Sequence, residues 1–165
     1  MNYSMVIVLA ILIDTGVFYA LYNKRDIHHL DSICILAHVL EGRYGRAYTT
    51  DLVISETATL IRYRIGLKAM MAFLDFLENS GIAIIFLDKE LYDGVIEVFK
   101  KYADRKLSFA DAFTIYAVDK LDIGRLATYD ERSFSGIVEE IVGKDYVEML
   151  GKEELERILT KIGLK

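Results

Sequence analysis

Four acidic side chains, far apart along the chain, stand in settings that are unusual for a solvated carboxylate. Glu56 sits among Ile54, Ala58 and Leu60, and Asp111 is flanked on both sides by apolar residues. Asp14 ends a continuous apolar run, and Asp130 follows a short apolar segment. A carboxylate that faces an apolar interior needs a counter-charge, and a metal ion is one natural supplier. The pattern therefore favours a metal-dependent site built from carboxylates.

Each acid taken alone has an ordinary explanation. Asp14 fits a helix cap, Glu56 a solvent-facing position, Asp111 the acidic partner of Ser108 in a capping box, and Asp130 the start of a turn. The combination of all four is harder to explain in this way.

The elements that must position these acids alternate between strands and helices. We predict strands at residues 5–13, 46–50, 82–87, 125–128 and 137–142, with the last at a sheet edge. We predict helices at 17–22, 27–40, 51–65, 67–78, 89–102, 108–118 and 152–162. Asp51 is the expected N-cap of the third helix, and Gly66 its expected end.

Alternating strands and helices indicate a parallel sheet flanked by helices, in which ligands meet the carboxyl ends of the strands. Asp14 and Asp130 follow two such ends and are expected to converge. We predict an α/β fold, one three-layer α/β/α domain around a mainly parallel sheet of four to five strands. Residues 1–145 would form this domain, and residues 146–165 a helical extension packed on it.

Composition limits the other options. A net charge of −5 and a pI near 5.2 argue against binding nucleic acid through a broadly basic surface, so any contact must be local. The single cysteine, Cys34, cannot form an internal disulfide. Cys34 and the three histidines are not spaced as the ligands of a structural zinc site. The apolar run from Met5 to Ile13 is too short to span a bilayer. We expect a cytoplasmic protein with no membrane partner.

Five short segments resemble motifs of the PIN-domain family, and they occur in the family's order. They are Asp14-Thr15-Gly16 with the apolar residues that follow, Asp26-Ile27-His28-His29, Ile54-Ser55-Glu56-Thr57, Ser108-Phe109-Ala110-Asp111-Ala112 and Thr128-Tyr129-Asp130-Glu131-Arg132-Ser133-Phe134. The resemblance covers roughly residues 5 to 142. Gly16 stands where the family often has Asn or Ser, and the tail beyond Lys144 has no counterpart.

The resemblance implies a metal-dependent endoribonuclease that acts on single-stranded or looped RNA and leaves a 5′-phosphate and a 3′-hydroxyl. Mg²⁺ or Mn²⁺ would relieve the repulsion among the four acids and activate a water molecule. Asp14 and Asp111 are expected to be the principal ligands, with Glu56 and Asp130 as further ligands or water-positioning groups. The hydroxyls of Thr128, Thr15 and Ser108 are expected to support them.

Basic residues near the acidic motifs are candidates for contact with the RNA backbone, although ordinary surface charge explains each one equally well. They are Arg62, Arg64 and Lys68 near Glu56, and Lys100, Lys101, Arg105 and Lys106 before Asp111. His28 and His29 are expected to be structural or exposed.

Small single-domain members of this kind resemble the toxin branch of the family. A toxin would be expected to form a homodimer and to be held inactive by an antitoxin protein. Helix faces around Leu36, Leu60 and Phe73 are candidate contact surfaces, with core packing as the alternative. RNA processing or quality control, or a non-catalytic RNA- or protein-binding scaffold, remain alternatives.

The motif Asp14-Thr15-Gly16 is also the signature of aspartic proteases, in which two carboxylates share a proton. That fold is almost all β and needs a second aspartate from a repeat or a dimer partner. The long helical segments here disfavour it. A phosphatase of the haloacid-dehalogenase type is also disfavoured, because Gly16 occupies the position of its second aspartate.

Overall fold

A computed structural model describes residues 9–164 of the chain and shows a five-stranded sheet in which every pairing is parallel. The strand order is β3-β2-β1-β4-β5, with the first strand in the centre. The strands are β1 (Ala10–Ile13), β2 (Arg46–Thr50), β3 (Ala83–Ile85), β4 (Arg125–Ala127) and β5 (Glu140–Val142). The predicted α/β fold is confirmed. Residues 5–8 of the first predicted strand lie outside the described residues.

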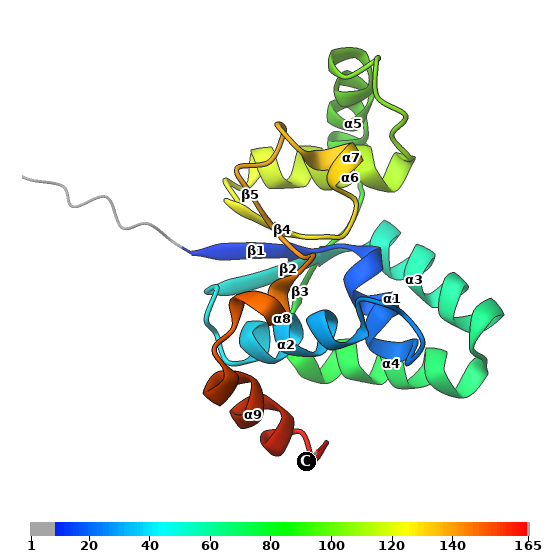
Figure 1. Ribbon diagram of the computed structural model, residues 1–165. Coiled ribbons are helices and arrows are strands. Elements are labelled where there is room, and N and C mark those ends of the chain that lie inside the picture. Colours follow the sequence, from blue (N-terminus) through cyan, green and yellow to red (C-terminus); the bar gives the residue numbers. More distant parts are fainter. Residues whose placement is uncertain (1–8, 165) are drawn as a thin grey trace, which may run out of the picture.

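Nine helices lie between residues 9 and 164. They are α1 (Thr15–Tyr22), α2 (His29–Leu40), α3 (Asp51–Arg64), α4 (Leu67–Ser80), α5 (Lys89–Lys101), α6 (Phe109–Lys120), α7 (Glu131–Phe134), α8 (Tyr146–Met149) and α9 (Lys152–Lys161). Figure 1 shows α5, α6 and α7 on one side of the sheet, and α1 to α4 with α8 and α9 on the other.

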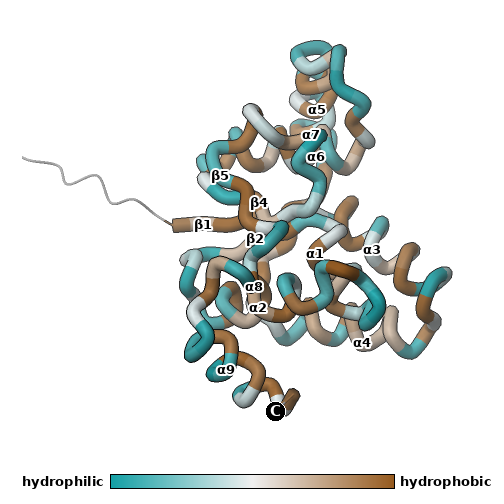
Figure 2. The backbone as a smooth tube through the Cα atoms, viewed as in Figure 1, coloured by the Kyte–Doolittle hydropathy of each residue, from teal (hydrophilic) through white to brown (hydrophobic). Residues whose placement is uncertain are grey.

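The central strand faces two cores because its side chains alternate between the two sides of the sheet. Ile11 and Ile13 belong to the core under α1–α4, whereas Ala10 and Leu12 belong to the core under α5–α7. All four residues are buried, and β1 is accordingly apolar along its whole length (Figure 2). A strand covered on both faces reads as an unbroken apolar run.

The core under α1–α4 is built around packed aromatic rings. Phe18 lies with its ring centroid 5.4 Å from that of Phe73 and 6.5 Å from that of Phe76. Phe73 is fully buried and Leu36 is 2% exposed, so neither offers a contact surface. The expectation that their helix faces bind a partner is therefore wrong for these two residues, which serve ordinary core packing.

Several helix boundaries differ from the predicted ones. Thr50, not Asp51, is the N-cap of α3, because its hydroxyl accepts the N–H of Val53 at 3.1 Å. The Asp51 carboxylate instead accepts the backbone N–H of Leu87 across to the segment after β3. Helix α4 continues to Ser80 and ends at Gly81, whose φ of 74° suits glycine. The four-residue helices α7 and α8 were not predicted.

The C-terminal segment lies against α2. Tyr146 of α8 and Ile158 of α9 are 5% and 1% exposed, and both belong to the core under α1–α4. The His38 ring lies 2.6 Å from the hydroxyl of Tyr146 and 2.8 Å from a carboxylate oxygen of Glu154. We propose on this basis that residues 146–165 form an extension of the same domain.

Replacement of Ile158 by alanine should therefore destabilise the whole domain. A large-to-small substitution in a closed core costs about 2–4 kcal/mol of unfolding free energy. Ile162→Ala is the matched control, since Ile162 is 44% exposed. Chemical denaturation should show one cooperative transition that moves only for Ile158→Ala. An unchanged midpoint for Ile158→Ala, or a separate early transition, would contradict a shared core.

Candidate functional site

Asp14 lies where the central strand ends, beside the end of β4. Its backbone N–H donates to the carbonyl of Ala127 at 3.0 Å, which joins the two strand ends. The hydroxyl of Thr128 donates to Oδ2 of Asp14 at 2.8 Å. Thr128 is itself approached closely by Gly143, where an added Cβ would lie 2.0 Å from the Thr128 carbonyl oxygen. Only glycine allows this approach, and it helps to hold Thr128 in place.

Glu56 reaches the same edge of the sheet from the first half of α3. The hydroxyl of Thr15, the first residue of α1, donates to Oε2 of Glu56 at 2.6 Å. Because Asp14 and Thr15 are adjacent, this bond holds the Glu56 carboxylate beside the end of β1. Asp14 and Glu56 were predicted to belong to one site, and the structure places both at this edge of the sheet.

Asp111 is held at the start of α6 by a reciprocal capping box. Its backbone N–H donates to Oγ of Ser108 at 3.1 Å, and its Oδ2 accepts the backbone N–H of Ser108 at 2.8 Å. The predicted helix start and capping box are confirmed. The carboxylate is thereby fixed at the N-terminus of the helix, where a negative charge is favourable.

Asp130 is the N-cap of the short helix α7 that follows β4. Its Oδ1 accepts the backbone N–H of Ser133 at 3.1 Å, and its Oδ2 accepts the Ser133 hydroxyl at 2.6 Å. Its own N–H donates to the hydroxyl of Thr128 at 3.1 Å. Both carboxylate oxygens are thus engaged by one neighbour, Ser133, a contact that motif spacing alone did not reveal.

The four acids influence one another electrostatically. Burial raises the pKa of Asp14 from 3.8 to about 6, while hydrogen bonds from Thr128 and Thr15 oppose the rise and repulsion from Asp111 and Glu56 adds to it. Burial likewise raises the pKa of Asp111, with the Ser108 bonds opposing and the charges of Asp130 and Glu56 adding.

A counter-charge for these acids is missing within the described chain. Among residues 9–164, no Lys, Arg or His forms an ion pair with Asp14, Glu56, Asp111 or Asp130. Asp14 is only 8% exposed, so water compensates its charge poorly. Hard carboxylate oxygens without a cationic partner fit a divalent cation such as Mg²⁺ or Mn²⁺.

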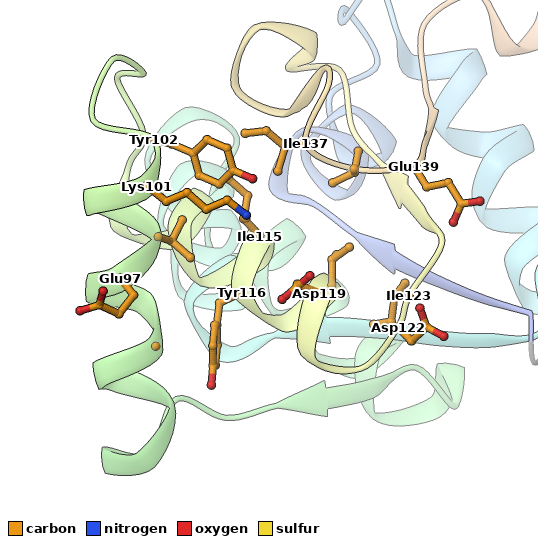
Figure 3. A pocket seen from close by; sticks show the side chains of 14 residues that line it. Glu97, Lys101, Tyr102, Ile115, Tyr116, Asp119, Asp122, Ile123, Ile137 and Glu139 are labelled. Atoms are coloured by element: carbon orange, nitrogen blue, oxygen red, sulfur yellow. The ribbon is translucent and has the colours of Figure 1, made fainter.

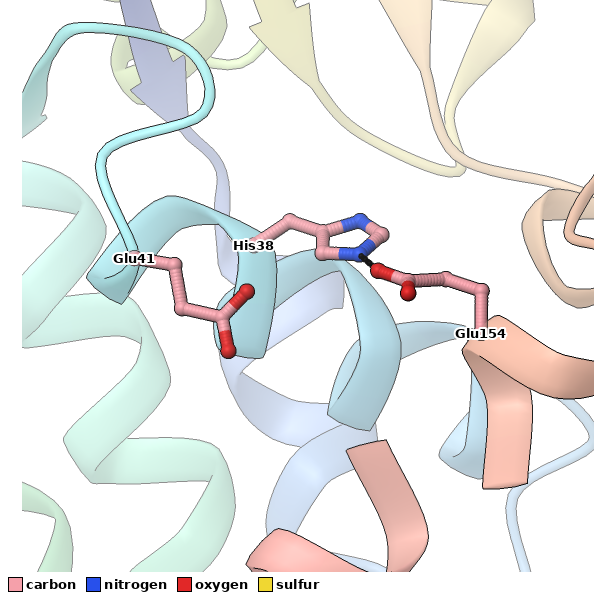
Figure 4. A group of neighbouring side chains, drawn as sticks. All are labelled: His38, Glu41 and Glu154. Carbon is pink, nitrogen blue, oxygen red and sulfur yellow. Dashed lines mark hydrogen bonds and ion pairs between the residues drawn. The ribbon is translucent and has the colours of Figure 1, made fainter. Parts of the chain in front are cut away.

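A different group of three side chains lies closer together. Within residues 9–164, His38, Glu41 and Glu154 have potential ligand atoms within 4.8 Å of one another (Figure 4), whereas no three of the predicted acids do. Arg157 bonds Glu41 and Glu154, each at 2.8 Å, and Lys161 bonds Glu41 at 2.9 Å. These cations already neutralise both carboxylates, so the group joins α2 to α9 without requiring a metal.

The basic residues before Asp111 differ in what they contact. The guanidinium of Arg105 donates to the backbone carbonyls of Arg132, Ser133 and Ser135, which ties the loop before α6 to α7. Lys106 and Arg132 are exposed and line, with Ser133, a cleft of about 320 Å³. Ser133 also holds Asp130, so this cleft adjoins the acidic site.

The other predicted basic residues lie on the surface. Arg62, Arg64 and Lys68 are exposed around the junction of α3 and α4. Lys100 forms an ion pair with Glu97 at 2.7 Å. No contact with the four acids holds any of these side chains within residues 9–164.

The two neighbouring histidines make structural contacts. The ring of His28 stacks on that of Tyr129, with centroids 4.0 Å apart and planes 10° from parallel. His29 Nδ1 lies 2.7 Å from the carbonyl oxygen of Ala20 near the end of α1. Both fit the expectation of structural histidines.

The described residues form two further hollows. A cleft of about 430 Å³ lies between α5, α6 and the segment before β5, and Figure 3 shows Lys101 and Tyr102 on one side of it and Asp122 and Glu139 on the other. It contains none of the four acids. A shallower groove of about 360 Å³ between α3 and α6 does include Glu56.

Fold and site together define an α/β protein whose acidic side chains meet at the carboxyl edge of a parallel sheet. The PIN-domain family model matches residues 11–139, and the chain belongs to the PIN-domain family. The resemblance of the five motifs is thus confirmed. The parallel sheet and its helices also remove the aspartic protease alternative.

Several relatives are informative. The chain is 36% identical over 151 residues to a VapC ribonuclease of Archaeoglobus fulgidus, covering 91% of this chain and 93% of the relative. The crystal structure of VapC20 of Mycobacterium tuberculosis, a sarcin-ricin loop cleaving toxin, has a TM-score of 0.65 at 25% identity and covers 78% and 97% of the two chains. FitAcB from Neisseria gonorrhoeae has a TM-score of 0.59 at 18% identity, covers 79% and 96%, and shows the fold alone.

Without metal, the Asp14 charge should destabilise the protein. The folded-state pKa of about 6 exceeds the ordinary 3.8, so stability is lost as the pH rises between these values and the loss is complete above them. Asp14→Asn keeps an acceptor for Thr128 and removes the charge. In chelator at pH 7.5, thermal unfolding should show the variant more stable by about 1–3 kcal/mol, and near pH 4 the gain should vanish.

Asp119→Asn, an exposed acid on α6, serves as the control and should change little at either pH. An Asp14→Asn variant that is no more stable than wild type at pH 7.5 would contradict the electrostatic cost assigned to Asp14.

Proposed function

We propose that the chain is a metal-dependent endoribonuclease that hydrolyses RNA phosphodiester bonds. The observation that supports this most is the set of four carboxylates at the sheet edge, one of them buried and none ion-paired within residues 9–164. The 36% identity to a VapC ribonuclease supports the same reaction class.

In this proposal Asp14, Asp111 and Glu56 would hold Mg²⁺ or Mn²⁺. Each has one oxygen fixed by a named hydrogen bond, from Thr128, Ser108 and Thr15 respectively. Asp130 is less available because Ser133 engages both of its oxygens. We therefore assign Asp130 to orienting water or the phosphate. The motifs alone predict the same role for Asp130 and Glu56, so this assignment separates the two.

The protein's own contribution is to hold charge and geometry. Thr128 connects Asp14 and Asp130 through one hydroxyl, which accepts the Asp130 N–H while it donates to Asp14. The Thr15 hydroxyl fixes the orientation of Glu56, and the backbone N–H of Ser108 fixes that of Asp111. When bound, the metal would lower the pKa of a water molecule and offset charge on the phosphate oxygens. No side chain is required as a nucleophile.

RNA would be held locally, since the chain carries a net charge of −5. Lys106 and Arg132 line the cleft beside Asp130, while Arg62, Arg64 and Lys68 are exposed near the junction of α4 with α3, the helix that carries Glu56. A strand of RNA passing over the acids could meet one basic group on either side. Such contacts would be few, so binding should weaken only modestly with salt.

We further propose that the protein is the toxin of a toxin–antitoxin pair and acts in the cytoplasm as a homodimer. The VapC ribonuclease and the solved VapC20 toxin support this role. No helix within residues 9–164 is long and apolar enough to cross a membrane. An antitoxin would be a protein that covers the acidic edge. A role in RNA processing or a silent scaffold is the alternative.

Purified protein should cut single-stranded RNA in the presence of Mn²⁺ or Mg²⁺. Chelator should abolish cutting, and Asp111→Asn should reduce the rate at least roughly a hundredfold because a charged ligand is lost while the cap is kept. Asp119→Asn, on the same helix, is the control. RNA decay that is equal for wild type and Asp111→Asn would indicate contamination and contradict the proposed site.

Thr128 should act as a positioning residue. Thr128→Val removes the hydroxyl that joins Asp14 to Asp130 and should lower both kcat and Mn²⁺ affinity, each by roughly tenfold. Thr128→Ser keeps the hydroxyl and should retain most of both. Calorimetric metal titration beside the cleavage assay checks this. Equal metal affinity in the valine and serine variants would overturn the assigned role.

A further inference from the structure

The groove between α3 and α6 begins at the acidic site and continues beyond it. Glu56 belongs to both, and Asp111 lies two residues after Phe109, which lines the groove. Its walls include the apolar side chains of Leu52, Leu60 and Phe109. An RNA strand with one phosphate at the four acids could therefore place the neighbouring nucleotide against this apolar surface.

Phe109 is the distinctive part of this surface. It is 37% exposed, although two aromatic rings of α5 hold it in place. Its ring centroid lies 5.9 Å from that of Tyr92, with the planes 28° apart, and 5.8 Å from that of Phe99. A ring that is fixed before binding loses little conformational freedom when a ligand packs on it.

The groove also offers polar groups one helical turn apart. Ser55 and Thr59 are exposed on α3 and line the same groove. Their hydroxyls can each donate and accept a hydrogen bond. An aromatic wall beside two small hydroxyls suits a planar, apolar-faced ligand with a polar edge, which is the chemistry of a nucleobase.

We propose that this groove binds the base of one nucleotide next to the cleaved bond. Phe109 packs against the base, while Ser55 and Thr59 contact its edge and bias the choice of base. The inference rests on the proposed ribonuclease function and adds a specificity site to it. A second copy of the chain or an antitoxin segment would be the other occupants of such a groove.

The test uses a single-stranded RNA whose cut site has been mapped with wild-type protein and Mn²⁺. Each nucleotide flanking the cut is replaced in turn by an abasic one. One position should lower the kcat/KM of wild type roughly five- to hundredfold, mainly through KM. Phe109→Leu should lose a similar factor on intact RNA and lose little more on that abasic substrate.

Two further variants sharpen the result. Phe86→Leu changes a 65% exposed phenylalanine outside the groove and should behave as wild type. The double variant Ser55→Ala, Thr59→Ala removes two hydroxyls and one methyl from exposed positions. It should therefore fold, and it should change base preference at the same position alone. This keeps the test decisive if Phe109→Leu folds poorly.

A flat abasic profile, with Phe109→Leu equal to wild type, would overturn the inference and leave the ribonuclease standing. A change of molecular mass in Phe109→Leu, measured by light scattering, would assign the groove to an interface between copies and overturn it as well. Failure of wild type to cut any RNA with Mn²⁺ or Mg²⁺ would overturn the proposed function together with the inference.

Discussion

The Asp14 carboxylate is buried without an ion-pair partner among residues 9–164, and the rest of the site is arranged around this constraint. A pKa raised from 3.8 to about 6 corresponds to about 3 kcal/mol at 1.36 kcal/mol per pKa unit. That is a large part of the stability of an ordinary domain. A fold that keeps such a group gains something from it, and a bound cation is the simplest compensation.

The same hydrogen bonds that position the acids also hold the fold together. Asp111 caps α6, Asp130 caps α7, and the Asp14 backbone joins β1 to β4. The Thr128 hydroxyl connects Asp14 to Asp130, and the Thr15 hydroxyl binds Glu56. Site and scaffold are therefore coupled. The apolar cores on both faces of β1 supply the stability that allows charges of one sign to remain close together.

Much of the fold could be predicted from the sequence because its signals are local. The capping box of Ser108 and Asp111 is a spacing, and the unbroken apolar run at β1 indicates a strand covered on both faces. The choice of Thr50 over Asp51 as N-cap was not local, since Asp51 is drawn to the N–H of Leu87 by the tertiary fold. Helices of four residues, such as α7, are too short for periodicity to show.

The site was only partly predictable because some of its contacts form between segments that are far apart in the sequence. The motifs identify the acids, and the bonds between Asp130 and Ser133 are a local N-cap that the motif comparison overlooked. The bonds of Arg105 to three carbonyls, by contrast, depend on packing. The close group of His38, Glu41 and Glu154 likewise needed the folded chain to appear, and its bonds to Arg157 and Lys161 argue that it is an ion-pair network.

The most direct test is calorimetric titration of Mn²⁺ into wild type, Asp14→Asn and Glu154→Gln at pH 7.5. We expect binding to be lost in Asp14→Asn and kept in Glu154→Gln. Binding that survives in Asp14→Asn, and disappears instead in Glu154→Gln, would place the metal at His38, Glu41 and Glu154 and contradict a metal site at Asp14.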